Sequence, residues 1–211
     1  LHKSSKRDYL ARMIDDKVHC MNIAKQYGKN YWDGDRRYGY GGYKYMPGRW
    51  KPVAEQMIDH YNLKGGDKVL DIGCGKGFLL YEMKLLIPDL EVSGIDISTY
   101  AIENCKQELS DSLRVGNANN LPFEDNCFDY VFSINTFHNL HCFDLELALV
   151  EMNRVSKKDQ YICIESYRNE IEKANLLYWQ VTCEAFCTPD EWEWWFKRLD
   201  YNGDYSFIYF E

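Results

Sequence analysis

The chain has 211 residues, of which 45% are hydrophobic and 27% charged, and its 33 acidic and 25 basic side chains give a formal net charge of −8. This length suits a single globular domain with a sizeable core, and the composition excludes a disordered chain. The acidic balance argues against nucleic-acid binding, which needs an excess of Lys and Arg, and no apolar run approaches the roughly 20 residues that span a bilayer. We therefore expect neither a nucleic-acid nor a membrane partner.

The N-terminal residues 1–7 include basic side chains, but no apolar segment follows them, so no secretory signal is expected. The eight cysteines form no CxxC pair, and most lie in apolar runs. Reduced thiols in a cytoplasmic protein are the simplest interpretation, and no cysteine spacing fits a structural zinc site. Cys183 and Cys187, four residues apart on an expected helix, are interpreted as core thiols.

The first part of the chain is expected to form an N-terminal cap over residues 1–63. Apolar positions between about residues 8 and 27 predict a loose helix that ends at Gly28. Residues 30–50 combine tyrosines, tryptophans, glycines, aspartates and arginines without a helical or strand period, so we expect an ordered loop, called here the aromatic lid. A short helix is predicted over residues 52–63.

From Lys68 onward, expected strands alternate with expected helices, as in a chain of βαβ units. The expected strands are Val69–Ile72, Glu91–Ile95, Leu113–Val115, Tyr130–Ser133, Tyr161–Ile164 and Tyr205–Phe210. The expected helices are Gly77–Leu86, Ser98–Leu109, Asp144–Val155, 170–187 and one that begins with Thr188 as N-cap, Pro189 and, at the third position, Glu191. The sequence thus predicts a single α/β domain, 1–211, with a cofactor-binding core at 64–168 and C-terminal helices and a last strand at 169–211.

The segment VLDIGCGKG is the most informative one, because glycines stand at every second position after a buried strand and an acid. Glycines allow a ligand to approach the backbone closely. A dinucleotide-binding turn places its third glycine three positions after the second, whereas Gly77 follows Gly75 by only two. Asp71, just before Gly73, would repel a pyrophosphate and suits a cationic or amine-bearing ligand. The loop therefore disfavours a nicotinamide oxidoreductase.

This loop, an acid at the end of the second strand and the stretch GNANNLPFEDNCFDYVFSINTFHNL together resemble the class I S-adenosylmethionine-dependent methyltransferases, in particular their small-molecule branch. The chain, including its YWDGDRRYGYGGYKY segment, is also similar to a bacterial subfamily of unassigned substrate. The resemblance covers about residues 65–210. It implies a Rossmann-like sheet, mostly parallel with a C-terminal antiparallel strand. Since only one strand follows the last helix, either the sheet has six strands or part of the family's usual antiparallel pair is missing.

The resemblance implies S-adenosyl-L-methionine as cofactor and S-adenosyl-L-homocysteine as product. Gly73, Gly75 and Gly77 would let the methionine part lie on the loop, with Asp71 near its ammonium group. Asp96 would accept both ribose hydroxyls, which requires an ionised carboxylate at the carboxyl end of a strand. The alternatives are that Asp71 only organises the turn and that Asp96 only starts the following helix.

The adenine side of the site is implied in the same way. Ile97 would pack on the adenine face, and Asn117 and Ala118 would meet its edge. The family more often has an aspartate there, although an amide oxygen can also accept a hydrogen bond from the adenine amino group. Asn135, after the fourth strand, would line the cofactor pocket.

His138 is the candidate catalytic base. It follows the fourth strand, where side chains enter the crevice of an α/β sheet, and histidine titrates near neutral pH. A hydroxyl or ammonium acceptor must lose a proton, so a base would assist methyl transfer. The alternative is a packing or hydrogen-bonding histidine. His141 lies three residues away, but no carboxylate motif joins the pair, so no metal is expected.

The aromatic lid is the candidate acceptor site, unless it only covers the core. Its rings could stack on an acceptor or surround a cation, and its guanidinium groups could hold a phosphate or carboxylate. Further candidates follow the fifth strand. The candidate substrate residues are Tyr31, Arg36, Arg37, Tyr38, Tyr43, Arg49, Glu165 and Arg168.

The arginines favour O-methylation of a small polar metabolite, such as a phosphorylated or nucleotide-linked sugar. The acidic side chains and tyrosines would instead suit N-methylation of a small amine. A third hypothesis is a non-catalytic subunit that binds S-adenosylmethionine or S-adenosylhomocysteine and regulates a partner. The sequence leaves the acceptor and the oligomeric state open.

Overall fold

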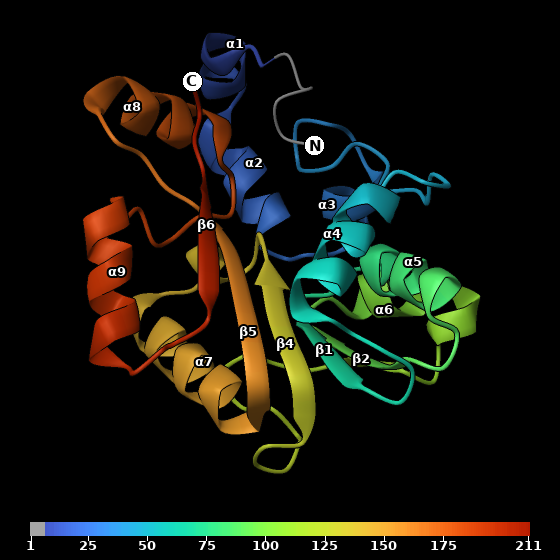
Figure 1. The fold of residues 1–211 in the computed structure, drawn as a ribbon. Coiled ribbons are helices and arrows are strands. Elements are labelled where there is room, and N and C mark those ends of the chain that lie inside the picture. The colour runs from blue at the N-terminus through green and yellow to red at the C-terminus, as the bar shows by residue number, and fades with distance from the viewer. Residues whose placement is uncertain (1–6) are drawn as a thin grey trace.

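The computed structural model describes residues 7–211. The expectation that no secretory signal is present concerns residues 1–7, of which 1–6 lie outside the described residues. Within residues 7–211, six strands form one sheet in the order β3-β2-β1-β4-β5-β6, each parallel to its neighbours (Figure 1). The strands are β1 (Lys68–Ile72), β2 (Glu91–Asp96), β3 (Leu113–Val115), β4 (Phe128–Ile134), β5 (Ser156–Glu165) and β6 (Asp204–Ile208). No helix of the described chain is long and apolar enough to cross a bilayer.

Helices cover both faces of the sheet (Figure 1). They are α4 (Lys51–Tyr61), α5 (Phe78–Leu86), α6 (Thr99–Glu103), α7 (Cys142–Val155) and α9 (Pro189–Arg198). Ala54 of α4 and Leu80 of α5 belong to the apolar core on one face, while Leu149 of α7 and Trp192 of α9 belong to the core on the other. β1 contributes to both cores, which explains why it reads as a nearly continuous apolar run.

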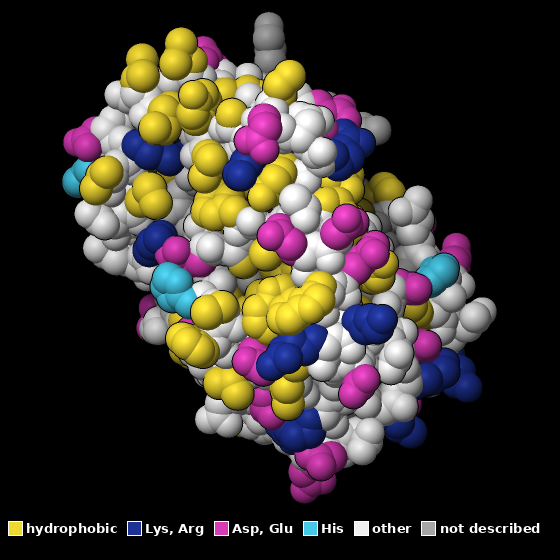
Figure 2. All heavy atoms as spheres, turned by 90° about the vertical axis from the view of Figure 1, so that its left-hand side faces the viewer, with side chains coloured by type: hydrophobic (Ala, Val, Ile, Leu, Met, Phe, Trp, Pro, Cys, Tyr) yellow, Lys and Arg dark blue, Asp and Glu magenta, His cyan; other side chains and the backbone are white. Residues whose placement is uncertain are grey.

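α9 begins as the sequence predicts. Thr188 caps it, Pro189 is its first residue, and Glu191 completes a capping box with the Thr188 backbone. Its outer side is open to solvent: Trp194 is 56% exposed, and its ring stands edge to the ring of Trp195 at 5.2 Å. On this face of the molecule, groups of apolar side chains lie between charged ones (Figure 2).

The N-terminal cap consists of α1 (Tyr9–Ile14), α2 (Lys17–Ala24) and α3 (Lys29–Asp33), and α1 lies beside α8 (Glu170–Trp179) (Figure 1). The single helix predicted over 8–27 is wrong. The chain breaks at Asp16, whose φ of 40° lies in the left-handed region and ends the regular helix. Cys20 and Ala24 of α2 pack with Val181, so the cap is fastened to the segment that follows α8.

The predicted antiparallel strand at the C-terminus is wrong. β6 pairs with β5 in parallel, with Tyr161 opposite Asp204 and Glu165 opposite Ile208. The chain leaves the carboxyl end of β5 and returns through α9, so β6 enters the sheet from the same end as β5. A hairpin joins neighbouring strands in antiparallel orientation, whereas parallel neighbours need a crossover connection, which α8 and α9 provide here.

Two predicted helices are too long. The helix predicted over 170–187 ends at Trp179, and residues 180–188 run as irregular chain toward α9. Cys183 and Cys187 therefore lie on this segment rather than on a helix, and both are free thiols. The helix expected to run from Ser98 to Leu109 ends at Glu103, although Ser98 caps it as predicted by accepting from the Ala101 N–H at 3.0 Å.

Candidate active site

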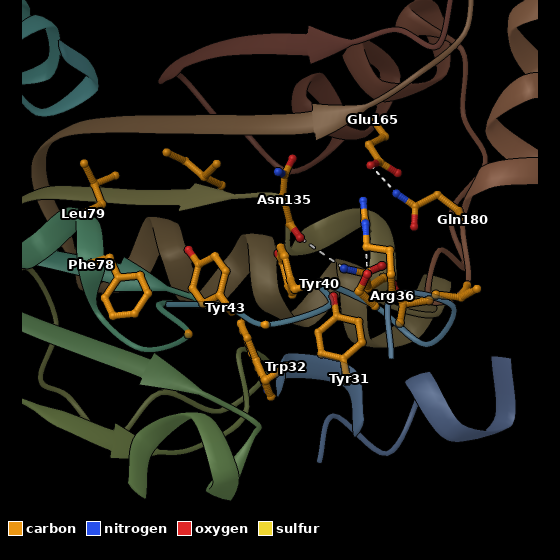
Figure 3. A pocket seen from close by; sticks show the side chains of 18 of the residues that line it. Tyr31, Trp32, Arg36, Tyr40, Tyr43, Phe78, Leu79, Asn135, Glu165 and Gln180 are labelled. Atoms are coloured by element: carbon orange, nitrogen blue, oxygen red, sulfur yellow. Dashed lines mark hydrogen bonds between the residues drawn. The ribbon is translucent and has the colours of Figure 1, made fainter. Parts of the chain in front are cut away.

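Residues at the carboxyl ends of four parallel strands meet at one edge of the sheet. Gly73 follows β1, Asn135 follows β4, Asp96 ends β2 and Glu165 ends β5. A cavity of about 760 Å³ extends along this edge from Phe78 past Asn135 to Glu165 (Figure 3). A second cavity of about 170 Å³ adjoins it on the β2 side. Both cavities are lined by Tyr31, Trp32, Tyr40, Gly73, Ile134, Asn135 and Asn139.

The glycine loop is shaped for close contacts. Gly73 and Gly75 have φ values of 87° and 54°, in the left-handed region. A Cβ at Gly73 would stand 1.9 Å from Oγ1 of Thr136, and one at Gly75 would stand 2.9 Å from the Trp32 ring. Both glycines line the larger cavity. Gly77 differs from the expectation, because it lines neither cavity and packs against Leu113 of β3.

Two buried carboxyl groups flank the glycine loop. Asp96 accepts from the Gly75 N–H at 2.7 Å and from the Ser98 N–H at 2.8 Å. Burial raises the pKa of Asp96, and these two hydrogen bonds oppose that shift. Burial and the neighbouring Asp96 hold the pKa of Asp71 well above its ordinary value. An ammonium or sulfonium group in the cavity would stabilise the ionised forms of both acids.

The smaller cavity has the features that the resemblance implies for an adenosine site. Asp96, Ile97, Asn117 and Ala118 all line it. Ile97 is 54% exposed, which leaves its side chain available to a ring. Asn117 Oδ1 accepts from the Asn119 N–H at 3.2 Å, so the loop bends around it. Together with the two buried acids, these residues fit S-adenosylmethionine.

The aromatic lid lies over the glycine loop, and its rings form a row along the larger cavity (Figure 3). Trp32 stacks on Tyr40 with ring centroids 5.2 Å apart and planes 10° apart, and Tyr43 stacks on Phe78 at 4.9 Å. Trp32 Nε1 donates to Oγ of Ser98 at 2.8 Å, which fixes the indole beside the end of β2. The row therefore offers apolar ring faces to a ligand in the cavity.

Lys76 ties the lid to the glycine loop, a role that the sequence analysis missed. Its Nζ donates to Oδ2 of Asp33 at 2.7 Å and to the Tyr43 carbonyl oxygen at 2.9 Å. Asp33 also accepts from the Tyr100 hydroxyl at 2.8 Å. Burial alone would raise the pKa of Asp33, but the hydrogen bonds from Lys76 and Tyr100 bring it below its ordinary value. The only sequence signal was a lysine placed between two glycines.

His138 and Glu165 form a buried pair on the wall of the larger cavity. His138 Nδ1 accepts from the Glu165 backbone N–H at 3.3 Å, and Nε2 lies 3.4 Å from Glu165 Oε2. Gln180 donates to the other carboxyl oxygen of Glu165. Burial raises the pKa of Glu165 to about 8, against smaller opposing effects of Gln180 and Arg7. Both histidine nitrogens therefore face Glu165, and the raised pKa keeps the carboxyl group largely protonated at neutral pH.

Three predicted substrate residues lie away from the cavities, because other groups bind them. Arg37 pairs with Asp15 at 2.7 Å. The Tyr38 hydroxyl lies 3.4 Å from His19. Arg168 pairs with Glu172 and Glu211. The other five expected substrate residues do line the larger cavity: Tyr31, Arg36, Tyr43, Arg49 and Glu165.

The structure adds cavity residues that the sequence did not indicate, namely Arg7, Arg12, Trp179 and Gln180. The two arginines lie on the cap helix α1 or just before it, and the other two lie at the end of α8. Only the fold brings these segments together. Within the described residues, no group of three or more His, Cys, Asp or Glu side chains could hold a metal ion.

Comparison with known proteins identifies the fold and family. Residues 63–200 match the family described as a methyltransferase domain. Over 145 residues the chain is 30% identical to a demethylmenaquinone methyltransferase of Symbiobacterium thermophilum, a match that covers 63% of this chain and 57% of that protein. The chain spans less than two thirds of the length of the curated relatives it matches.

Solved structures show the same fold. YcgJ from Bacillus subtilis has a TM-score of 0.58 at 22% identity, over 70% of this chain and 67% of that one. A putative methyltransferase bound to the Trm112 methyltransferase activator of Haloferax volcanii has a TM-score of 0.56 at 22% identity, over 71% of this chain and 72% of that one. With more than half of its residues matched, the chain belongs to the class I S-adenosylmethionine-dependent methyltransferases.

Proposed function

We propose that this protein is an S-adenosylmethionine-dependent methyltransferase that acts on a small polar acceptor bound in the larger cavity. One observation carries the proposal: the larger cavity connects the expected cofactor edge, at Gly73 and Asn135, with the buried pair of His138 and Glu165. S-adenosylmethionine, when bound, supplies an electrophilic methyl group and leaves as the neutral thioether S-adenosylhomocysteine. The chain's own residues would then orient the acceptor and remove its proton.

Glu165 is the group that we assign as proton acceptor for a hydroxyl. The new bond joins the acceptor oxygen to the methyl carbon, the carbon–sulfur bond breaks with its electron pair staying on sulfur, and the hydroxyl proton goes to the Glu165 carboxylate. A pKa of about 8 suits this transfer, because the base form is populated at slightly alkaline pH and still holds a proton well. Glu165 is buried, so little water can reach its carboxyl group.

His138, the residue that the sequence singled out as the base, acts in this proposal together with Glu165. Its Nδ1 accepts from the Glu165 backbone, which favours a proton on Nε2, facing the Glu165 carboxyl oxygen. The imidazole, with its proton on Nε2, would orient the carboxylate and stabilise its ionised form, while the proton removed from the acceptor stays on Glu165. His138 is thus proposed as a positioning residue for Glu165.

The acceptor that we propose is a phosphorylated or nucleotide-linked sugar, methylated on oxygen. The ring row of Trp32, Tyr40 and Tyr43 would support the sugar or base, and Arg36 and Arg49 supply positive charge at the cavity wall. The runner-up is N-methylation of a small amine, which the buried acids Asp71 and Glu165 would favour.

Two other possibilities come from the relatives. The match to a demethylmenaquinone methyltransferase of Symbiobacterium thermophilum makes a demethylmenaquinone-like acceptor the third candidate, because aromatic rings line the larger cavity of this chain. The complex of a similar structure with the Trm112 activator suggests that the activity of this chain could depend on a partner. A non-catalytic regulatory subunit is the candidate function outside the enzymes.

A screen for methyl transfer tests the proposal. The protein is incubated with S-adenosylmethionine carrying an isotope-labelled methyl group and with pools of sugar phosphates, nucleotide sugars, amines and quinols, and products are detected by mass spectrometry. We expect label in a sugar phosphate or nucleotide sugar. Glu165→Gln should lower turnover by roughly 100-fold or more without changing cofactor affinity. Glu184→Gln is the control, because Glu184 pairs with Lys25 and lines neither cavity.

Calorimetry separates the remaining classes. Binding of S-adenosylmethionine with no binding of NAD supports the proposal, and tight binding of NAD alone would overturn it. Cofactor binding without transfer to any pool, alone or with Trm112-type activators, would favour the regulatory subunit.

A further inference from the structure

Three arginines converge on one indole ring at the outer end of the larger cavity. The Cζ atoms of Arg7, Arg12 and Arg36 lie 5.6, 5.6 and 5.4 Å from the ring centroid of Trp179. All four side chains line the cavity. They come from the start of the cap, from α1, from the aromatic lid and from the end of α8, so only the folded chain assembles them.

Arg12 and Arg36 are held by backbone carbonyl groups, which are neutral. Arg12 Nε donates to the Trp179 carbonyl oxygen at 3.2 Å, and its Nη1 donates to the Arg36 carbonyl oxygen at 3.0 Å. Nη1 of Arg36 donates to the Gly39 carbonyl oxygen. These bonds fix the positions of Arg12 and Arg36 without cancelling their charges.

Among the ion pairs of residues 7–211, none joins a carboxylate to Arg12 or Arg36, although Glu165 interacts electrostatically with Arg7. Asp15 pairs with Arg37 on the outer surface, and Glu165 lies deeper, between His138 and Gln180. Burial lowers the pKa of the Arg12 guanidinium, and the neighbouring positive charge of Arg36 lowers it further. The protein as a whole carries a charge of −8, so this local positive charge runs against its average.

We propose that Arg7, Arg12 and Arg36, arranged around Trp179, form a binding subsite for a phosphoryl group of the acceptor. Guanidinium groups bind phosphate oxygens through paired hydrogen bonds, and the indole face holds them in place by cation–π contact. A phosphoryl group carries up to two negative charges and three terminal oxygens, which matches three cations better than a single carboxylate does. The group would lie at one end of the acceptor, and the reacting hydroxyl would lie toward Glu165 at the other.

The role of this subsite in catalysis rests on the proposed function, but phosphate binding can be measured without any turnover. The protein is titrated by calorimetry, at low ionic strength, with inorganic phosphate, glucose 1-phosphate, glucose and acetate. We expect saturable binding of the two phosphates and none of glucose or acetate. Arg12→Gln and Arg36→Gln should each weaken phosphate binding about tenfold or more. Arg36→Lys, which keeps the charge but loses the planar fork, should weaken it less.

Arg37→Gln is the matched control, because Arg37 neighbours Arg36 in sequence but pairs with Asp15 outside the cavity. The subsite is refuted if phosphate does not bind, if acetate binds as tightly as phosphate, or if the control weakens binding as much as the two cavity variants. S-adenosylmethionine affinity is measured in every variant and should stay unchanged. If the protein binds S-adenosylmethionine but not phosphate, the subsite is refuted and the methyltransferase proposal stands. If it binds phosphate but not S-adenosylmethionine, the subsite stands and the methyltransferase proposal is refuted.

Discussion

Nζ of Lys76 lies 2.7 Å from Oδ2 of Asp33, and this ion pair fastens the aromatic lid to the glycine loop. The Lys76 side chain is only 6% exposed, so its charge depends on the carboxylate and on the Tyr43 carbonyl oxygen for compensation. A second contact supports the first, since Glu82 of α5 accepts from the Tyr45 hydroxyl and from the Gly48 N–H, both at 2.9 Å. These contacts tie the aromatic lid, which lines the larger cavity, to the glycine loop and to α5.

Asp33→Asn should destabilise the protein by roughly 3 kcal/mol, because removing one partner leaves a buried ammonium group without its counter-charge. Urea unfolding at neutral pH measures the change. Asp59→Asn is the control, since Asp59 is exposed on α4, and it should change the free energy of unfolding by less than about 0.5 kcal/mol. Equal effects of the two substitutions would show that the Lys76 pair does not hold the lid.

Asp96→Asn should weaken S-adenosylmethionine binding by about 10- to 100-fold, because a hydrogen bond to an ionised carboxylate contributes roughly 1.5–3 kcal/mol. The substitution keeps the size of the side chain and removes its charge. Calorimetry on folded protein gives the affinity, and Glu91→Gln at the opposite end of β2 serves as control. An unchanged affinity in Asp96→Asn would refute the assignment of Asp96 to the ribose.

Stability should fall as pH rises through the range in which Glu165 titrates. The folded protein keeps a proton on Glu165 up to about pH 8, whereas in the unfolded chain a glutamate loses it near its ordinary pKa of about 4.3. The stabilisation that comes from the protonated Glu165 is therefore complete below about pH 4.3. It declines between about pH 4.3 and pH 8, and it is absent above pH 8. Thermal unfolding of Glu165→Gln should show a flatter pH dependence and a gain on the order of a few kcal/mol, relative to the parent, at pH 9. Parallel curves for parent and variant would contradict the raised pKa.

The rate of methyl transfer should rise with pH along a limb whose midpoint is near 8, because the carboxylate form of Glu165 is the base. His138→Asn should move that midpoint while leaving the affinity for S-adenosylmethionine unchanged, since the imidazole lies 3.4 Å from the carboxyl oxygen. Initial rates between pH 6 and pH 10 test this. A variant with the parent's midpoint and a lower rate would indicate that His138 has a structural role only.

Thr188→Ala should lower the free energy of unfolding by about 1 kcal/mol, because the Thr188 hydroxyl accepts a hydrogen bond from the Glu191 N–H at the start of α9. Thr188→Ser keeps that acceptor and should stay close to the parent in urea unfolding. If both substitutions cost the same, the loss arises from the methyl group rather than from the cap.

The order of strands and helices could be predicted from the sequence, because local patterns determine it. The apolar run of β1, the glycines after it and the capping box at Thr188 act over a few residues, and the structure confirms each of them. The wrong direction expected for β6 came from the family resemblance and not from a local pattern. The observed parallel direction depends on α9 carrying the chain back along the sheet before β6 pairs with β5.

The sequence by itself indicated the expected donor side of the site, since the glycine loop is a short motif after one predicted strand and Asp96 ends the next predicted strand. Only the tertiary structure decided the acceptor side. His138 meets Glu165 across 27 positions, Lys76 meets Asp33 across 43, and Arg12 meets Arg36 across 24. Such contacts form when packing of the cap on the sheet compensates the entropy lost in closing the loops between them, and no local pattern records that balance.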